Sequence, residues 1–282
     1  MQKIGILTDT TSDLSLEVQD TENIKIIPLQ VIFNDGRTFR DKYDISYREC
    51  MASLDEYDTK TSLPVIAEAV RAFDEFVEEG YTHVIVMTIS HNLSGTYNMV
   101  KTVSEEYKDK LVIENIITRS VAYGIGHVAI ESARMAAAGE SFDSIVSYAG
   151  RSFENQQINF AVETLKYLQK GGRIGRLSGT IGEALDIKPI INMTEEGKLV
   201  PVDKVRGRKK SILKIEEITK SLAEKHSMDK IYIAHGDRLE DAQKLKERIS
   251  DITEKEVDIV DLGTLVSVHA GPGVLGTICI WK

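Results

Sequence analysis

The 282-residue chain has little of what marks several large classes of protein. Its only two cysteines, Cys50 and Cys279, stand far apart and form neither a metal-binding nor a redox motif. No apolar run approaches the ~18 residues that a membrane-spanning helix needs. The opening residues, MQKIGILTDTTSD, become polar after a short apolar stretch, so we expect no signal peptide. We therefore expect a cytoplasmic protein that makes at most transient contact with a membrane surface.

Common motifs of nucleotide and ester chemistry are also missing. The chain has no G-x-x-x-x-G-K-[ST] loop of a P-loop kinase and no G-x-S-x-G elbow of an α/β-hydrolase. His83 and His91 do not have the spacing of zinc ligands. These motifs therefore predict no catalytic residue and no metal.

Two glycine-rich segments fit a dinucleotide fingerprint only in part. Residues 124–129 (GIGHVA) and 271–276 (GPGVLG) have the glycines, but neither is followed by a strand where a βαβ unit requires one. We interpret these glycines as turn residues. The sequence therefore predicts no nucleotide cofactor.

What is present is the composition of a chain with a large core, 42% hydrophobic and 28% charged. The length predicts about two domains, and we expect them at residues 1–153 and 154–282. In the first, apolar runs that predict strands at 3–7, 24–33, 83–89 and 111–118 alternate with helices at 64–79, 126–138 and 142–153. Such alternation favours a mostly parallel sheet with flanking helices. The second has a predicted hairpin over 187–205, helices at 212–225 and 239–249, and strands at 158–162, 231–235, 257–261 and 277–281, which indicate an α/β domain with a mixed sheet.

The pattern also predicts two details of packing. Residues 84–89 and 111–117 do not alternate cleanly, so we expect both strands to be covered on both faces. The helix at 64–79 has a proline in its first turn. We expect it to face the core through Ile66, Val70, Phe73 and Val77.

Hydroxyl side chains gather where predicted strands give way to helices. Residues 8–13 (TDTTSD) follow the first strand, at an edge of the sheet where ligand sites collect. Residues 90–97 (SHNLSGTY) leave the strand at 83–89 and begin a helix near Thr96. Residues 60–64 (KTSLP) likewise precede a helix. Helix capping explains each segment alone, but the last two together favour a site for one carboxylate or phosphate.

Basic residues are concentrated in two short segments. Residues 166–176 hold four and residues 204–214 hold six, with no acid in either. The other 260 positions carry 25 basic and 44 acidic residues, a net charge of −19 within the total of −9. The two segments form either a solvated face or a surface for an acidic partner. Overall acidity and the lack of aromatic residues in 204–214 argue against a nucleic-acid partner.

Six segments, in order along the chain, resemble the DegV family of lipid-binding proteins. They are residues 8–13, 93–97 (LSGTY), 163–174 (ETLKYLQKGGRI), 187–191 (IKPII), 202–210 (VDKVRGRKK) and 268–273 (VHAGPG). The resemblance covers nearly the whole chain. It implies a two-domain α/β fold with a ligand cleft between or adjoining the domains.

The resemblance implies further that the ligand is one long-chain fatty acid, such as palmitate, stearate or oleate, and that there is no cofactor. Its carboxylate would be bound by Thr61 and Ser94 with the N–H of Gly95, beside Ser62. Arg173 and His269 would belong to the surrounding network. Bacterial proteins of this kind present the acyl chain to a separate fatty acid kinase, whose acyl-phosphate product enters phospholipid synthesis.

The basic residues Arg206 and Lys209 would suit docking of that kinase. Three segments depart from the family pattern. Leu63 and Val65 stand in a loop that usually reads Thr-Ser-Gln-Pro followed by Ser or Thr, residues 117–120 (ITRS) replace an Asp-Ser segment, and Ala270 replaces threonine. These changes bear on acyl-chain preference more than on the head-group site.

Two other classes of function compete with a carrier. One is an enzyme, either a phosphotransferase or a hydrolase that uses Ser94 and His269 on an acyl substrate. The missing nucleotide loop and nucleophile elbow argue against it. The other is a nucleic-acid binder that uses residues 204–214, which the charge of the whole chain argues against.

Overall fold

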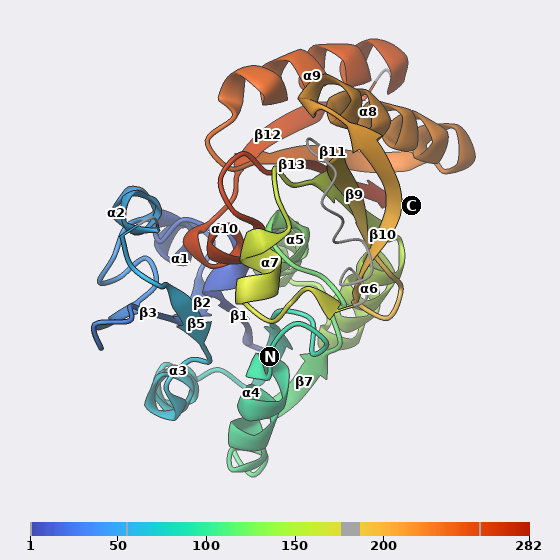
Figure 1. The fold of residues 1–282 in the computed structure, drawn as a ribbon. Helices are drawn as coiled ribbons and strands as arrows, with labels where there is room; N and C mark the ends of the chain where they lie inside the picture. Colours follow the sequence, from blue (N-terminus) through green and yellow to red (C-terminus); the bar gives the residue numbers. More distant parts are fainter. Residues whose placement is uncertain (1, 55, 176–186, 254) are drawn as a thin grey trace. The chain divides into compact units, whose positions relative to one another are not determined.

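The computed structural model describes residues 2–54, 56–175, 187–253 and 255–282. The chain divides into two compact units, Met1–Glu154 (unit 1) and Asn155–Lys282 (unit 2), coloured blue to green and green to red in Figure 1. Each unit has its own sheet and helices and is described by itself.

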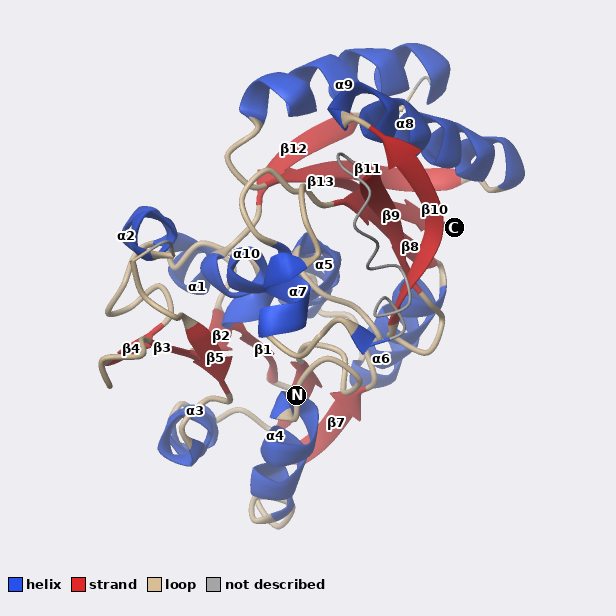
Figure 2. Cartoon of the chain, in the orientation of Figure 1, coloured by secondary structure: helices blue, strands red, loops and turns tan. Residues whose placement is uncertain are grey.

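Unit 1 is built on a four-stranded parallel sheet. Its strands follow the order β2 (Ile24–Ile27), β1 (Ile4–Asp9), β6 (His83–Met87) and β7 (Val112–Ile116). Side chains alternate between the two faces, so that Ile6 and Leu7 of β1 belong to different core clusters. On the face of Ile6 lie α1 (Glu17–Thr21), α5 (Tyr123–Ala137) and α6 (Phe142–Glu154); on the face of Leu7 lie α3 (Ile66–Glu78) and α4 (Thr96–Glu105) (Figure 2). The predicted parallel sheet with flanking helices is confirmed.

Unit 1 also contains a small antiparallel sheet that the sequence pattern did not indicate. It has the order β4 (Thr38–Arg40), β3 (Gln30–Ile32) and β5 (Lys60–Ser62), with α2 (Tyr47–Ser53) between β4 and β5 in the chain. The prediction of one strand over 24–33 was therefore wrong. Pro28 has no N–H to donate to a ladder, and the N–H of Leu29 bonds to Thr10 Oγ1 at 3.2 Å. The chain thus leaves the parallel sheet after Ile27.

Unit 2 is built on a six-stranded mixed sheet, as predicted. Its order is β10 (Leu199–Arg206), β9 (Ile187–Met193), β8 (Gln156–Ala161), β13 (Leu275–Trp281), β11 (Met228–His235) and β12 (Val257–Asp261). The β11–β12 pair is parallel and the other pairs are antiparallel, including the predicted hairpin of β9 and β10. Two long helices, α8 (Arg208–Lys225) and α9 (Leu239–Thr253), pack on the sheet through residues such as Ile215 and Leu245. Two short helices, α7 (Lys166–Lys170) and α10 (Thr264–Ala270), lie beside the candidate site residues: Arg173 follows α7, and His269 lies in the last turn of α10.

The strand β7 is not covered on both faces, contrary to the prediction. It ends the sheet, and its residues alternate between exposed and less exposed positions. Val112 is 53% exposed, whereas Ile116 is buried. A short apolar run does not distinguish such an edge strand from a central one.

The core-facing side of α3 also differs from the prediction. Ile66, expected to be in the core, is 60% exposed and begins the helix. The buried positions are Ala69, Ala72, Phe73 and Phe76, which lie on one helical face. The two alanines carry a weak hydrophobic signal, and for this reason the larger side chains of the other stripe dominated the prediction.

The glycines of the two fingerprint-like segments have different roles. Gly271 and Gly273 lie in a turn with φ of +80° and +83°, as predicted. For Gly124 and Gly126 the prediction of a turn was wrong, because both lie inside α5. A Cβ on Gly126 would stand 2.5 Å from the carbonyl oxygen of Ser12, so the close approach of α5 to the loop after β1 requires glycine.

Candidate functional site

The C-terminal ends of β1 and β6 form the topological switch point of unit 1. From β1 the chain continues to β2 on one side of the sheet, while β6 lies on the other side. The loops that leave these two strands are the hydroxyl-rich segments 8–13 and 90–97. Ligands of open α/β sheets bind in the crevice at such a point. This part of unit 1 is therefore a candidate ligand site.

Asp9 connects these two loops. Its carboxylate is fully buried and accepts the N–H of Ile89 at 2.9 Å and the N–H of Thr11 at 2.8 Å. Burial raises the pKa of Asp9, an effect that these hydrogen bonds oppose. Helix capping was one interpretation of this segment, and Asp9 does cap the short 3-10 helix η1 (Thr10–Ser12). The bond to Ile89 was missed because a contact between two strands leaves no local sequence signal.

Ser94 lies directly before α4, which begins at Thr96 as predicted. Its hydroxyl lies 2.9 Å from that of Thr96 and accepts the Thr96 N–H at 3.3 Å. Gly95 between them is exposed, and its N–H has no protein acceptor among the described residues. The helix start thus presents one hydroxyl and one free N–H, which is the chemistry that an anion needs.

Thr61 and Ser62 lie in β5 rather than at a helix start, which corrects the prediction for the segment 60–64. Thr61 pairs with Val31 of β3 and is half-buried, whereas Ser62 is exposed. The residue that follows, Leu63, reaches the start of α4, because a Cβ on Gly95 would lie 3.5 Å from both of its methyl carbons. The structure therefore brings this segment and the Ser94 segment together, through Leu63 and Gly95.

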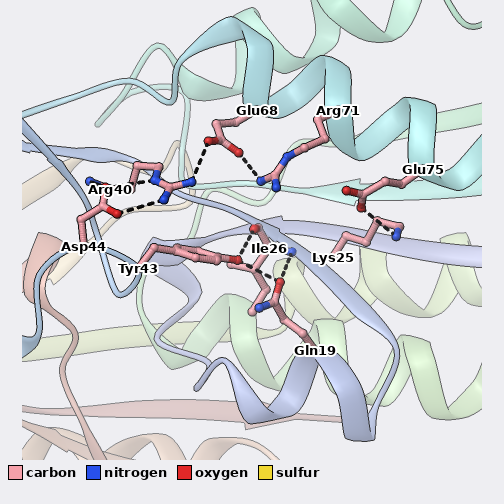
Figure 3. Close-up of polar contacts among 9 residues, drawn as sticks. All are labelled: Gln19, Lys25, Ile26, Arg40, Tyr43, Asp44, Glu68, Arg71 and Glu75. Atoms are coloured by element: carbon pink, nitrogen blue, oxygen red, sulfur yellow. Dashed lines mark hydrogen bonds and ion pairs between the residues drawn. The ribbon is translucent and has the colours of Figure 1, made fainter.

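Ion pairs connect α3, the helix after the Thr61 segment, to β4 (Figure 3). Arg40, at the end of β4, pairs with Asp44 at 2.9 Å and with Glu68 of α3 at 3.4 Å, and Glu68 also pairs with Arg71. The pairs join the strand before α2 to the helix that follows the Thr61 segment. They lie outside the candidate site and hold α3 against β4.

The same region closes the outer edge of β2. The Tyr43 hydroxyl donates to the carbonyl oxygen of Ile26 at 3.2 Å, and Gln19 Oε1 accepts the Ile26 N–H at 3.3 Å (Figure 3). A groove of about 380 Å³ runs along this edge. Lys25 on its wall is paired with Glu75 at 3.0 Å and with a second glutamate, so its ammonium is already engaged within the protein.

In unit 2, Arg173 and His269 meet where α7 packs on α10. A Cβ on Gly171, after α7, would overlap the imidazole of His269. A Cβ on Gly271, after α10, would overlap the ring of Tyr167. Arg173 donates from Nη1 to the carbonyl oxygen of Gly171 at 2.6 Å. The two glycines therefore make room for a close arginine–histidine pair.

The surroundings of His269 favour its neutral form. Removal of the ring from water lowers the pKa of His269 to about 4, and the positive charge of Arg173 acts in the same direction. At pH 7 Arg173 is thus the cation of the pair. His269 is then a neutral imidazole, in which one ring nitrogen can donate a hydrogen bond and the other can accept one.

The basic segment 204–214 does not form one outward face, which corrects part of the prediction. Arg206 and Lys209 are exposed and make no ion pair with a described residue. Arg208 is turned inward and pairs with Asp241 at 3.0 Å. Lys214 is paired with two acidic side chains. The sequence could not distinguish these orientations, because a run of basic residues does not indicate which side chains face the solvent and which face the protein.

The other basic segment, 166–176, is split as well. Lys166 and Lys170 are exposed on α7, whereas Arg173 is half-buried beside His269. Arg176 lies outside the described residues. Within the described ranges, no three or more His, Cys, Asp or Glu side chains are grouped as a metal site would require. In the same ranges, no helix combines the length and the apolar character that crossing a membrane demands.

These features define a class of protein: a two-unit α/β chain with a hydroxyl-lined switch point in one unit and a glycine-packed arginine–histidine pair in the other. The family model described as "Uncharacterised protein, DegV family" matches residues 3–282. The chain belongs to the DegV family, as the resemblance predicted. A DegV domain-containing protein of Clostridium acetobutylicum is 40% identical, with 100% of each chain covered. A second relative, from Clostridium perfringens, is 33% identical, with 98% of each chain covered.

Solved structures share the whole fold. The fatty acid binding DegV family protein of Streptococcus agalactiae matches with a TM-score of 0.90 at 27% identity, with 100% of each chain covered. DegV of Bacillus subtilis, described as a fatty acid binding protein, matches with a TM-score of 0.88 at 27% identity and the same coverage. A stearic acid-binding protein of Eubacterium ventriosum matches with a TM-score of 0.88 at 28% identity, covering 100% of this chain and 99% of that one.

Proposed function

We propose that this protein binds one long-chain fatty acid and carries it without catalysing a reaction of its own. The observation that supports this most is the match of the entire fold, at TM-scores of 0.88 to 0.90, to three proteins described as binding fatty acids. The two candidate regions add support, because the one in unit 1 offers hydroxyls and a free N–H and the one in unit 2 offers an arginine, all of them donors that a carboxylate can use.

The acyl chain would supply most of the affinity. Moving about 14 methylenes out of water is worth on the order of 11 kcal/mol, at ~0.8 kcal/mol each, before the costs of binding are subtracted. The carboxylate at the end of a buried chain would then lose its own hydration. It must therefore find hydrogen-bond donors in the protein.

We assign the carboxylate to the hydroxyls of Thr61 and Ser94 and the N–H of Gly95, with Ser62 beside them. The contact of Leu63 with Gly95 supports this assignment, since it joins the two segments that carry these groups. Arg173 would contribute positive charge and His269 a neutral hydrogen bond to the surrounding network.

A carboxylate held by two hydroxyls and an N–H can leave one oxygen accessible. We propose that a separate fatty acid kinase phosphorylates this oxygen with ATP, and that the acyl-phosphate enters phospholipid synthesis. Arg206 and Lys209 would dock the kinase; both are exposed, and neither pairs with a described acidic residue.

Native mass spectrometry of freshly purified protein tests the binding. We expect one bound acyl chain, which extraction would identify. The Thr61→Ala/Ser94→Ala double variant should retain it at least tenfold less well, whereas Thr102→Ala, an exposed hydroxyl on α4, serves as the matched control. A protein that stays empty in the presence of oleate and palmitate contradicts the proposal. Unchanged affinity in the double variant contradicts the head-group assignment alone.

Acyl-phosphate formation with added kinase and ATP tests the docking surface. Arg206→Glu/Lys209→Glu should impair it strongly and leave oleate affinity unchanged, while Lys220→Glu, exposed on the same helix as Lys209, should affect neither. Equal losses in both assays would contradict docking. ATP or ester turnover by the protein alone, abolished in Ser94→Ala, would show an enzyme instead of a carrier.

A further inference from the structure

Arg208 joins three separate parts of unit 2. It lies in the first turn of α8, and its guanidinium donates from Nε and Nη2 to Asp241 Oδ2 of α9, at 3.1 and 3.0 Å. Its Nη1 donates to the carbonyl oxygen of Gly273 at 2.6 Å and pairs with Glu163 at 3.1 Å. The side chain is 23% exposed, so these contacts are largely shielded from water. The planar guanidinium has several N–H donors and can make all of these contacts at once, whereas the single ammonium group of a lysine cannot.

The contacts of Arg208 lie at the ends of the two segments that carry the arginine–histidine pair. Glu163 stands just before α7, and Gly273 lies in the turn after α10. The two segments also touch directly, since a Cβ on Gly273 would lie 2.7 Å from Glu163 Cγ. Lys188 of β9 holds Glu163 from the other side, with its ammonium 2.9 Å from the carboxylate and 3.1 Å from the carbonyl oxygen.

The positions of Glu163 and Gly273 determine the positions of Arg173 and His269. Gly171 and Arg173 follow Glu163 through one short helix, and His269 precedes Gly273 by a single turn of chain. Because Gly171 leaves no spare room beside the His269 ring, a small displacement of either segment changes the distance between the ring and Arg173.

We propose that Arg208 is a positioning residue of the fatty acid site. It acts through Glu163 and Gly273 to keep the side chains of Arg173 and His269 in a fixed position relative to each other. This role rests on the proposed function. It separates Arg208 from Arg206 and Lys209, its neighbours in the chain, which face outward. One basic segment then serves two purposes, with Arg208 supporting the proposed ligand site and Arg206 and Lys209 available to a partner.

The test compares Arg208→Gln with the matched variants Arg206→Gln and Lys209→Gln. Oleate affinity is measured by displacement of cis-parinaric acid, far below the unfolding temperature of each variant. We expect at least a tenfold loss for Arg208→Gln and less than a twofold change for the other two. Arg208→Lys, which keeps the charge but loses the planar guanidinium, should resemble Arg208→Gln, and it serves as the test if the glutamine variant does not fold.

A second measurement separates positioning from general stability. In protein carrying ¹⁵N-labelled histidine, the His269 imidazole signals should shift in Arg208→Gln, while those of His83 and His91 in unit 1 stay unchanged. A folded Arg208→Gln with wild-type His269 signals and wild-type affinity would overturn the proposal, even if its unfolding temperature falls. If the wild-type protein binds no fatty acid, the proposed function fails, and the His269 signals still decide whether Arg208 positions the pair.

Discussion

Two regions of the molecule, an open half in unit 1 and a packed half in unit 2, are built in different ways. In unit 1, Ser94, Gly95 and Ser62 stand on loop and strand ends that are open to solvent or half-buried, and their donors are hydroxyls and an N–H. In unit 2, Arg173 and His269 are held against glycines, with no space for an added methyl group at Gly171.

This difference teaches where sequence changes can be accommodated. An open half loses donors one at a time when its side chains are replaced, and the surrounding fold is little affected. A closely packed half loses geometry and stability together, because any added atom must displace a neighbour. The following experiments challenge this contrast, starting with the largest expected effect.

Gly171→Ala should have the largest effect. The new methyl group would overlap the His269 imidazole, so we expect about a hundredfold loss of oleate affinity and a loss of stability of about 1–3 kcal/mol. Displacement assays and urea unfolding measure the two. Gly150→Ala is the control, since a Cβ at that position of α6 meets nothing within 4 Å and should stabilise by about 0.5–1 kcal/mol. An unaffected Gly171→Ala would show that the packed half is not rigid.

The second largest effect should be a loss of stability at acidic pH that arises in the packed half. The pKa of His269 is lowered from 6.5 to about 4 in the folded protein, so between these values the unfolded chain binds more protons than the folded one. The contribution to stability is complete above pH 6.5 and is lost as the pH falls towards 4, by at most about 3 kcal/mol. Urea unfolding at several pH values should show a smaller dependence in His269→Gln than in the wild type, and His91→Gln should behave like the wild type. Identical curves for His269→Gln and the wild type would contradict the assignment.

Asp9→Asn tests whether the open half has a rigid base. The amide keeps the size of the carboxylate but turns one acceptor into a donor, so it cannot accept the N–H groups of both Ile89 and Thr11 in the same way. We expect a loss of about 1–3 kcal/mol and faster amide exchange over residues 88–95. Asp20→Asn, at an exposed position, is the control. Unchanged exchange would mean that Asp9 does not order the loop of Ser94.

The smallest effect should come from Glu68→Gln. It weakens the pairs with Arg40 and Arg71, whose side chains are 40% and 55% exposed. Pairs of this kind contribute about 1 kcal/mol or less. Thermal unfolding should change little and oleate affinity should stay within twofold. A large loss of affinity would show that the ion pairs, rather than the backbone of β5, position Thr61.

Local patterns made the main features of unit 1 predictable from the sequence. The start of α4 at Thr96 follows from a strand end, a hydroxyl and a helical repeat that are neighbours in the chain. The mixed sheet of unit 2 was signalled by the hairpin of β9 and β10, whose turn and alternation are local too. The Thr61 segment, by contrast, was predicted as a helix start because its strand partner, β3, is about thirty residues away in the chain.

Contacts between distant residues account for what could not be predicted. Leu63 meets Gly95, Asp9 meets Ile89, and Glu163 meets Arg208, all through tertiary packing that no periodicity records. The opposite orientations of Arg206 and Arg208 have a similar cause. One residue ends a strand and the other begins a helix, so their side chains leave the backbone in directions that depend on the turn between them.

Gly171 and Gly271 also limit how such a protein can be redesigned. Since every other side chain at these positions collides with His269 or Tyr167, single substitutions there cannot widen or narrow the proposed ligand site gradually. Leu63 is less restricted, because it is 37% exposed and lies at an ordinary contact distance of 3.5 Å from a Cβ on Gly95. For the proposed fatty acid site, a library aimed at new acyl-chain preferences therefore has its useful diversity at Leu63 and Val65, with both glycines kept constant.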